Sequence, residues 1–218
     1  MATDYLSIGA NLSQNRNPFN YEKVEQVARD ISTSWLTLEE ITQQLNLVDD
    51  ESQDSYLSGL ELATRMAIED YLGMSIFPVQ YRVYYANPAI TGSAIGFDLP
   101  EVTQGLCGIT INSVGFWDGN TPSVFIPVES TTYQYDPTGN QLILNSLPSN
   151  LSTQIANPIV ITYTTKANPL ASYPVIKQAG LLMLTHLYNN RSNTIQGSLN
   201  EIPFGVSALL RPYKPLVM

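Results

Sequence analysis

Apolar residues recur at helical spacing in three stretches of the chain. The first, Leu38 to about Leu45, follows Thr37-Leu38-Glu39-Glu40, a capping box in which side chain and backbone satisfy each other's groups. The second runs to Leu72, with Asp54 or Ser52 expected as its N-cap and Gly73 at its left-handed end. The residues expected on its buried face are Leu57, Leu60, Ala63 or Ala67, and Tyr71.

The third helix runs from Val175 to about Asn190, with Pro174 at its first position, where a missing N–H does no harm. It is apolar most of the way round, which indicates burial in its own domain or against a neighbouring subunit. The residues predicted for this core or subunit interface are Val175, Ala179, Leu182, Met183, His186 and Leu187. Gly180 lies in mid-helix, where the close approach of another backbone would explain it.

A weaker helical pattern lies nearer the N-terminus. Val24, Val27, Ala28 and Ile31 would share one face of a short helix over residues 21–31, with residues 32–35 extended after it. Residues 1–20 are polar and rich in Asn, which is typical either of a poorly ordered end or of an arm that orders on a partner.

From Ile76 the period changes to that of a strand. Val79, Tyr81, Val83 and Tyr85 alternate with more polar positions. Further strands are predicted at residues 108–117, 123–128, 131–135, 141–144 and 158–164, with turns at Asp118-Gly119-Asn120 and at residues 136–140. Residues 76–165 therefore predict an antiparallel sheet or small barrel inserted between helices.

The predicted fold class is α+β. A helical core of three to four helices is expected from residues 35–75 together with 166–218, which include the C-terminal tail. Residues 1–34 are expected to form an N-terminal arm, and residues 76–165 the β insertion.

The charge pattern argues against binding to nucleic acid or to a membrane. The formal net charge is -9, and Arg65 is the only base between Glu39 and Asp70. No Lys or Arg occurs from Val83 to Thr165. Binding to a phosphate backbone or an anionic membrane needs a basic surface. An acidic surface would instead suit a conduit wall, to which a sliding polyanion does not adhere.

Cysteine content and the lack of targeting signals indicate the compartment in which the protein is made. Cys107 is the only cysteine, so an intrachain disulfide or a cysteine metal cluster is not expected. The N-terminus lacks the pattern of a signal peptide, and no apolar run is long enough for a membrane span. We expect synthesis and assembly in a reducing cytoplasm.

Candidate chemistry is sparse. No nucleophile elbow, phosphate loop or dinucleotide fingerprint occurs, and the single histidine, His186, fits a core or interface position better than a catalytic base. Acidic and polar residues from Asp50 to Glu61 have calcium-loop spacing, but Ser55 replaces the turn glycine, and capping explains the same residues. No metal or cofactor is predicted.

Aromatic residues are frequent in the β insertion. They are Tyr81, Tyr84, Tyr85, Phe116, Trp117, Tyr133 and Tyr135. Ordinary sheet packing accounts for them, and a carbohydrate-binding platform is the sharper alternative.

Several motifs together resemble the tailed-phage head–tail connector (adaptor) family, in its larger form with a β insertion. The resemblance covers roughly residues 35–214. It comprises the short helix up to Leu45, the acidic link at residues 49–51, the helix ending Tyr71-Leu72-Gly73 and the segment 173–179. Its most specific part is the run from His186-Leu187-Tyr188-Asn189-Asn190-Arg191 to Ile202-Pro203-Phe204-Gly205-Val206 and Leu209-Leu210-Arg211-Pro212-Tyr213.

This resemblance implies a structural protein of the virion and not an enzyme. It implies a ring of about twelve identical subunits beneath the portal vertex, which extends the DNA channel and offers a platform to a tail, nozzle or stopper protein. DNA would pass without specific binding, and no membrane contact is implied. The protein would be made in the host cytoplasm and reside at the head–tail interface.

The C-terminal tail is the predicted portal contact. Residues 203–218 are expected to extend away from the last helix, and the segment is punctuated by proline and carries two cations on an acidic chain. The predicted docking residues are Arg211, Tyr213, Lys214 and Leu216.

Two other functions stay open at the level of sequence. One is a β-rich module that binds carbohydrate or another surface and carries helical flanks. The other is a hydrolase that uses His186.

Overall fold

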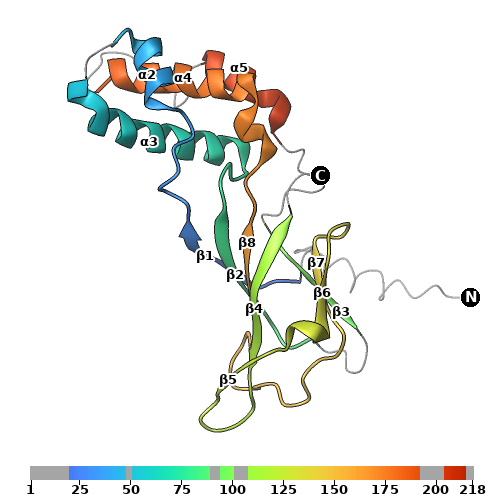
Figure 1. Ribbon diagram of the computed structural model, residues 1–218. Helices are drawn as coiled ribbons and strands as arrows, with labels where there is room; N and C mark the ends of the chain where they lie inside the picture. Colours follow the sequence, from blue (N-terminus) through green and yellow to red (C-terminus); the bar gives the residue numbers. More distant parts are fainter. Residues whose placement is uncertain (1–19, 48–50, 89–93, 101–107, 192–203, 215–218) are drawn as a thin grey trace, which may run out of the picture. The chain divides into compact units, whose positions relative to one another are not determined.

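The chain divides into two compact units, which are described separately. The computed structural model describes residues 20–47, 51–88, 94–100, 108–191 and 204–214. Among these described residues, those up to Val27 and those of Gln80–Thr164 form the β unit, and those of Ala28–Val79 and from Thr165 onward form the helical unit (Figure 1). In sequence, the predicted β insertion, residues 76–165, overlaps the second segment of the β unit.

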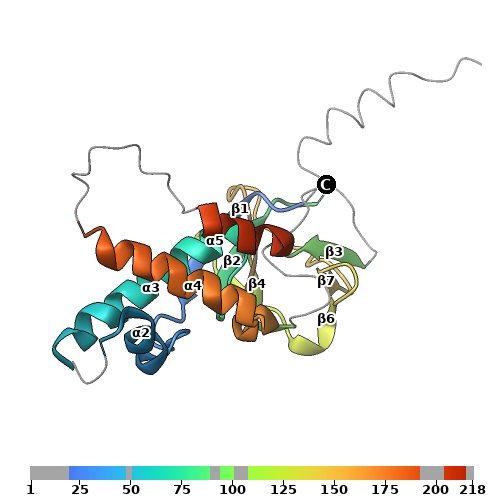
Figure 2. The ribbon, with the colours of Figure 1, turned by 90° about the horizontal axis from the view of Figure 1, so that it is seen from above.

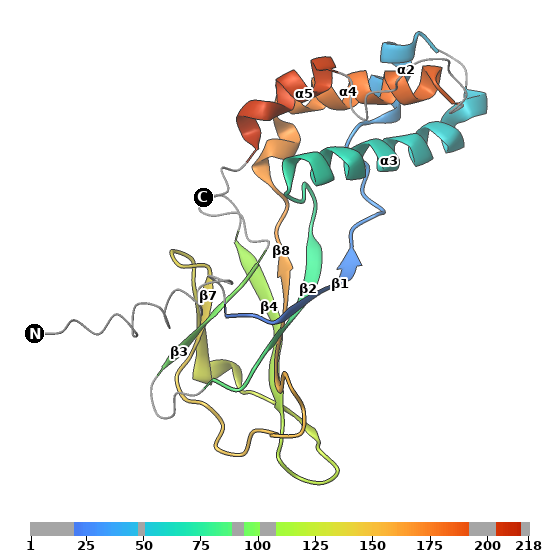
Figure 3. The same cartoon turned by 180° about the vertical axis from the view of Figure 1, so that it is seen from behind.

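The β unit contains two antiparallel sheets (Figure 3). The larger sheet has the order β1-β2-β8-β4-β5, and the smaller has the order β3-β7-β6. The larger is built from β1 (Lys23–Arg29), β2 (Val79–Tyr85), β8 (Ile159–Thr165), β4 (Ile109–Trp117) and β5 (Phe125–Pro127). The smaller is built from β3 (Ile95–Asp98), β7 (Gln141–Leu144) and β6 (Tyr133–Asp136), the last preceded by the 3-10 turn η2 (Ser130–Thr132).

The alternation in β2 reflects a sheet with one buried face. Tyr81 pairs with Tyr163 and Val83 with Ile161 across β2 and β8, and these side chains are buried. The Tyr85 ring meets Phe97 of β3 edge-on, with 4.9 Å between centroids, and its hydroxyl donates to the Asp98 carbonyl at 2.7 Å. The core of the β unit therefore lies between its two sheets, whose described strands do not close into a barrel.

Turn chemistry in this unit follows the sequence. The Asp136 carboxylate accepts hydrogen bonds from the Thr138 amide at 2.8 Å and from its hydroxyl at 2.6 Å. Asn140 takes the left-handed conformation, with φ 51°. The predicted turn at residues 136–140 thus joins β6 to β7, as expected of an Asx turn.

The short helix predicted over residues 21–31 is wrong. Lys23–Arg29 forms β1, an edge strand beside β2, and the Glu22 amide donates to the Tyr84 carbonyl at 2.9 Å. The apolar residues of this segment are partly to fully exposed, so little burial was available to select a helix. Pairing with a neighbouring strand satisfies the backbone instead.

The helical unit contains α2 (Leu38–Leu45), α3 (Asp54–Leu72), α4 (Pro174–Asn189) and α5 (Phe204–Leu210). Short 3-10 turns are η1 (Glu51–Gln53), η3 (Pro169–Ser172) and η4 (Arg211–Tyr213). The capping box of α2 is present: Thr37 Oγ1 accepts from the Glu40 amide at 3.1 Å, and Glu40 Oε2 accepts from the Thr37 amide at 2.9 Å.

The prediction for α3 is correct at its C-terminal end and wrong at its N-terminal end. Gly73 has φ 67° and closes the helix as predicted. The N-cap is Gln53, without a side-chain capping bond, because η1 leads directly into the helix; neither Asp54 nor Ser52 caps it.

Helix α4 is central to the helical unit. It contacts α2, α3 and α5 (Figure 2), and Ile176, Ala179, Met183 and Leu184 are buried in the shared core. Gly180 does make a close approach, but its neighbour is the indole of Trp35 and not another backbone. The other three helices therefore pack around α4, the apolar helix that the sequence singled out.

The extended C-terminal tail predicted from residue 203 is wrong for its first part. Residues 204–210 form α5, whose Val206 and Leu210 are buried against the helical core. The 3-10 turn η4 follows directly, and residues 215–218 lie outside the described chain. Two apolar residues at i and i+4 were a helical signal that the flanking prolines obscured.

Candidate interaction sites

A row of buried polar side chains lies along α3 and organises the helical unit. Glu61, Arg65 and Glu69 follow at intervals of four residues, so they share one helix face. The Glu61 carboxylate accepts from the amides of Trp35 at 2.8 Å and Leu36 at 3.2 Å. Of the face predicted from the sequence, Leu57 is buried, Leu60, Ala67 and Tyr71 are partly buried, and Ala63 is exposed.

Arg65 is fully buried in the middle of this row. Its guanidinium donates to the carbonyls of Thr33 at 2.7 Å and Asp30 at 2.6 Å, and it stacks over Phe77 at 4.7 Å from the ring centroid. The segment that leads into α2 is therefore tied to α3 through side chains that satisfy its backbone, as buried polar groups require.

Glu69 completes the row at the C-terminal end of α3. It accepts from the amide of Ile76 at 2.6 Å and from Arg29 Nη2 at 2.5 Å, with only 2% of its side chain accessible. All three residues are thus consumed by internal bonds. Glu61, the last ligand of the considered calcium spacing, is one of them, and nothing in the described residues favours that site.

The predicted docking residues near the C-terminus form a compact turn on the helical unit. The ring of Tyr213 meets Tyr173 edge-on at 6.0 Å between centroids, and the Lys214 ammonium lies over the Tyr71 ring at 5.0 Å. Arg211 is exposed, and its side chain forms no hydrogen bond with a described residue. Leu216 lies outside the described residues.

The predicted core or interface residues of α4 separate into two groups. Ala179 and Met183 are buried, and His186 and Leu187 are half-buried. Val175 and Leu182 are 38% and 37% exposed, and they lie on a different face of the helix from the buried residues. The α4 helix thus leaves apolar side chains in solvent within a single subunit.

His186 has an amide as its neighbour. Its Nδ1 lies 3.3 Å from Asn190 Nδ2, which also donates to the His186 carbonyl at 2.8 Å. A catalytic histidine needs a nucleophile or an orienting carboxylate at such a distance. The geometry of His186 therefore gives the hydrolase hypothesis no support.

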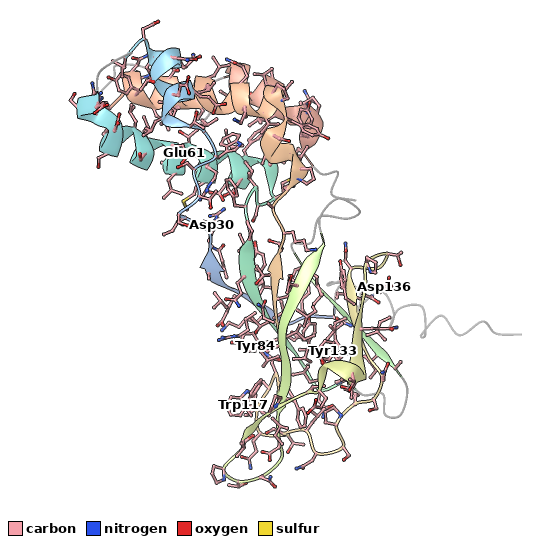
Figure 4. All side chains as sticks on the ribbon, in the orientation of Figure 1. Asp30, Glu61, Tyr84, Trp117, Tyr133 and Asp136 are labelled. Carbon is pink, nitrogen blue, oxygen red and sulfur yellow. The ribbon has the colours of Figure 1, made fainter. Side chains whose placement is uncertain are left out.

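A pocket lies on the outer face of the larger sheet, entirely within the β unit. It has a volume of about 290 Å³ and is lined by Arg82, Tyr84, Ser113, Trp117, Phe125, Val160 and Thr162. In Figure 4 the side chains of Tyr84 and Trp117 lie on the side of this sheet away from Tyr133. The pocket therefore crosses β2, β8, β4 and β5 on the face opposite the core.

The far wall of the pocket is positioned by the predicted turn after β4. Buried Asp118 accepts from the Val124 amide at 2.7 Å, which places Phe125 opposite Trp117 in the antiparallel pair. A Cβ at position 115 would lie 2.3 Å from the Phe125 ring, so Gly115 provides the space for that ring. A glycine is needed there because the ring lies directly over the backbone.

The aromatic rings of the pocket do not form a flat platform. Trp117 and Phe125 meet at 63° with 5.5 Å between centroids. A sugar ring stacks on a planar aromatic surface, so this arrangement offers little to the carbohydrate hypothesis. Of the predicted aromatic set, Tyr81 and Tyr85 face the core, where they pack as ordinary sheet residues.

Of the charged side chains near the pocket, Glu25 and Lys23 pair with each other, whereas Arg82 has no hydrogen-bond partner among the described residues. Glu25 accepts from the Tyr84 hydroxyl at 2.7 Å and pairs with Lys23, and these bonds, Lys23 first, lower the pKa of Glu25. Arg82 forms no hydrogen bond with any described residue. Sequence reasoning missed this pocket, and the available signal was Tyr84, an aromatic residue in the polar phase of β2.

Within the described ranges, no three His, Cys, Asp or Glu side chains gather as metal ligands would. Nor does that part of the chain contain a helix with the length and apolarity that a membrane crossing demands.

Comparisons with known proteins give matches in structure alone. No family model matches the chain, and no curated protein matches it in sequence. A chain from the virion of a native gene transfer agent (GTA) particle superposes with a TM-score of 0.59 at 19% identity. A chain from the neck of an empty GTA particle, computed with C6 symmetry, gives 0.58 at 18% identity.

A third chain, from the neck of a native GTA particle computed with C12 symmetry, gives a TM-score of 0.53 at 16% identity. Each superposition covers 90% of this chain and 97% of the other. The chain therefore shares the fold of these particle subunits along nearly its whole length, helical unit and β unit included.

Proposed function

We propose that this chain is a structural protein of the neck of a tailed phage or phage-like particle, a head–tail connector. Copies of it form a ring between portal and tail, and the ring extends the DNA channel. The observation that carries the proposal is the fold shared with GTA neck and virion subunits over 90% of this chain and 97% of theirs.

The extent of the likeness supports this assignment more than its score does. Fold alone does not define function, because common folds host many activities. Here a helical unit and a two-sheet β unit occur together, and both are present in the matched chains. The particle necks computed with C6 and C12 symmetry support a cyclic arrangement for this chain, with about twelve copies.

The charge of the chain suits a channel for DNA. A net charge of -9 gives a surface that repels phosphate, so a passing duplex would not adhere. Buried Arg65 and paired Arg29 are consumed inside the helical unit, which leaves still fewer cations for DNA contact. We assign the protein no enzymatic activity.

Apolar residues left in solvent are the proposed subunit interface. Val175 and Leu182 lie on one exposed face of α4, and a neighbouring subunit in the ring would cover them. Arg211 and Lys214, with Tyr213 between them and Leu216 beyond, are the proposed portal contact. Arg211 is the strongest of these because its guanidinium is exposed and uncommitted.

Mass photometry of the purified chain, alone and with its portal protein, tests the function. We expect a discrete ring of about twelve subunits, formed alone or on the portal. A monomer that stays monomeric in both conditions contradicts the proposal. Arg211→Glu should weaken portal binding and leave the ring intact, and Lys166→Glu, another exposed cation of the same unit, is the matched control.

A further inference from the structure

The outer face of the larger sheet carries an apolar cluster at the pocket, among polar residues such as Arg82, Ser113 and Thr162. One face of an antiparallel sheet usually packs on the core while the other carries polar side chains. Here Val160 is 7% exposed, and the rings of Tyr84, Trp117 and Phe125 surround it. At the rim of the pocket, Phe125 on the edge strand β5 is 38% exposed. An apolar surface of this kind marks a protein contact.

The positive charge of Arg82 favours a negatively charged group on any molecule that binds in this pocket. Its guanidinium lines the pocket and forms no hydrogen bond with a described residue. Arginine pairs with carboxylates through two parallel hydrogen bonds, and such pairs are strong when water is excluded. Glu25, whose pKa the charge of Arg82 also lowers, already accepts from Lys23 and Tyr84. The occupant should therefore bring a carboxylate of its own.

The size of the pocket suits side chains and not a cofactor. Its volume of about 290 Å³ is at the lower end of the range for small-molecule sites. A space of this size accepts one or two side chains of a protein partner. Anchors of protein interfaces occupy such pockets, with aromatic residues and arginine supplying much of the binding energy.

The charge balance of the chain identifies a second copy as the occupant. In the described residues, the carboxylates that form no side-chain hydrogen bond are Glu22, Glu51, Asp54, Asp70 and Glu129. The cations in that condition are Arg82, Lys166, Arg211 and Lys214, the last of which lies over the Tyr71 ring. A second copy, with a net charge of -9, therefore offers carboxylates without a hydrogen-bond partner to an arginine that also lacks one in the described residues.

We propose that the pocket formed by Arg82, Tyr84, Trp117 and Phe125 receives an acidic segment of a second copy of this chain. The contact joins two different surfaces, a pocket on one copy and a carboxylate elsewhere on the next. Contacts of this head-to-tail type generate rings when the rotation closes. The inference rests on the proposed ring and names one of its subunit contacts.

Photo-crosslinking from the pocket tests this contact. Phe125 is replaced by benzoylphenylalanine, which keeps an aromatic ring at the position, in the purified full-length chain. An equal mixture of ¹⁴N and ¹⁵N chains is irradiated, so that mass spectrometry separates crosslinks between copies from those within one copy. We expect mixed-label crosslinks to a peptide that contains Asp or Glu.

Charge variants then test the role of Arg82. Arg82→Glu should lower the yield of mixed-label crosslinks about tenfold, and Arg82→Gln should lower it less. Lys166→Glu makes the same charge change outside the pocket and should leave the yield unchanged. Circular dichroism of each variant checks that the fold is retained.

Three results overturn the proposal: no mixed-label crosslink, crosslinks to a peptide without an acid, or yields insensitive to both Arg82 variants. Mass photometry of the same samples separates this failure from that of the proposed function. Rings without pocket crosslinks contradict the pocket contact alone, whereas the absence of rings, also on the portal, contradicts both.

Discussion

The indole of Trp35 lies directly against Gly180 of α4. A Cβ at position 180 would fall 2.6 Å from Cη2 and 2.7 Å from Cζ3 of that ring. Trp35 Nε1 donates to the Ala171 carbonyl of the η3 turn at 2.9 Å, which fixes the orientation of the ring against α4. The segment before α2 is thereby anchored to the central helix, and a glycine in mid-helix gains a physical reason.

Gly180→Ala should destabilise the helical unit. Alanine is the better helix former by about 1 kcal/mol, but the added methyl group overlaps the Trp35 ring and forces it to move. Overpacking of a filled core typically costs about 1–3 kcal/mol, so we expect a net loss. Urea unfolding followed by circular dichroism measures the change.

Gly59→Ala is the matched control for this substitution. Gly59 is also a helical glycine, in α3, but a Cβ there meets nothing within 4 Å. We expect it to raise the free energy of unfolding by about 0.5–1 kcal/mol. Equal stabilisation by both alanines would contradict the close packing of Trp35 on Gly180.

Local signals explain which parts of this fold could be read from the sequence. The α2 capping box, Gly73 and the turn at residues 136–140 act over a few residues, and each is found as expected. The strand alternation at β2 also survives, because one face is buried. By contrast, β1 depends on a strand far along the chain, which no local pattern reports.

The buried row on α3 was not predictable for a related reason. Glu61, Arg65 and Glu69 look like surface residues, since charged side chains are rarely fully buried without partners. Their partners are backbone groups of residues 30–36 and 76–77, whose positions depend on the tertiary fold. The Arg82 pocket is likewise assembled from four strands and has no contiguous motif.

Glu61→Ala should be among the most destabilising substitutions in the helical unit. It leaves the buried amides of Trp35 and Leu36 without an acceptor, and each unsatisfied group costs about 1–3 kcal/mol. Glu61→Gln retains one carbonyl oxygen at the same place and should cost less. Denaturant unfolding of both variants measures the difference, and equal losses would contradict the acceptor role of this side chain.

Asp30 should make stability depend on pH in the acid range. Hydrogen bonds from Thr33, and then from Ser32, lower the pKa of Asp30 from 3.8 to about 2. The folded state therefore favours the ionised form. Its contribution is fully present above the unfolded-state pKa, near 4, and is lost as the pH falls through about 2.

Asp30→Asn removes this titration. The difference in unfolding free energy between wild type and variant should be constant above about pH 5, shrink as the pH falls, and level off below about pH 2. Carbon-detected NMR titration of the Asp30 carboxyl gives the pKa directly. A measured pKa close to 3.8 would contradict the hydrogen bonds that the Asp30 carboxylate accepts from Ser32 and Thr33.

Leu210→Ala tests whether the C-terminal segment is part of the folded core. Leu210 is fully buried on α5, so its truncation should cost about 2–5 kcal/mol. Ala208→Ser, at an exposed position of the same helix, should stay within about 0.5 kcal/mol. If Leu210→Ala were as mild as Ala208→Ser, the segment would behave as the extended tail that the sequence suggested.

A large loss of stability in Leu210→Ala also determines how portal docking must be tested. Deletions that begin at or before Tyr213 remove its ring contact with Tyr173, so Arg211→Glu and deletion of residues 215–218 are the better tests of docking.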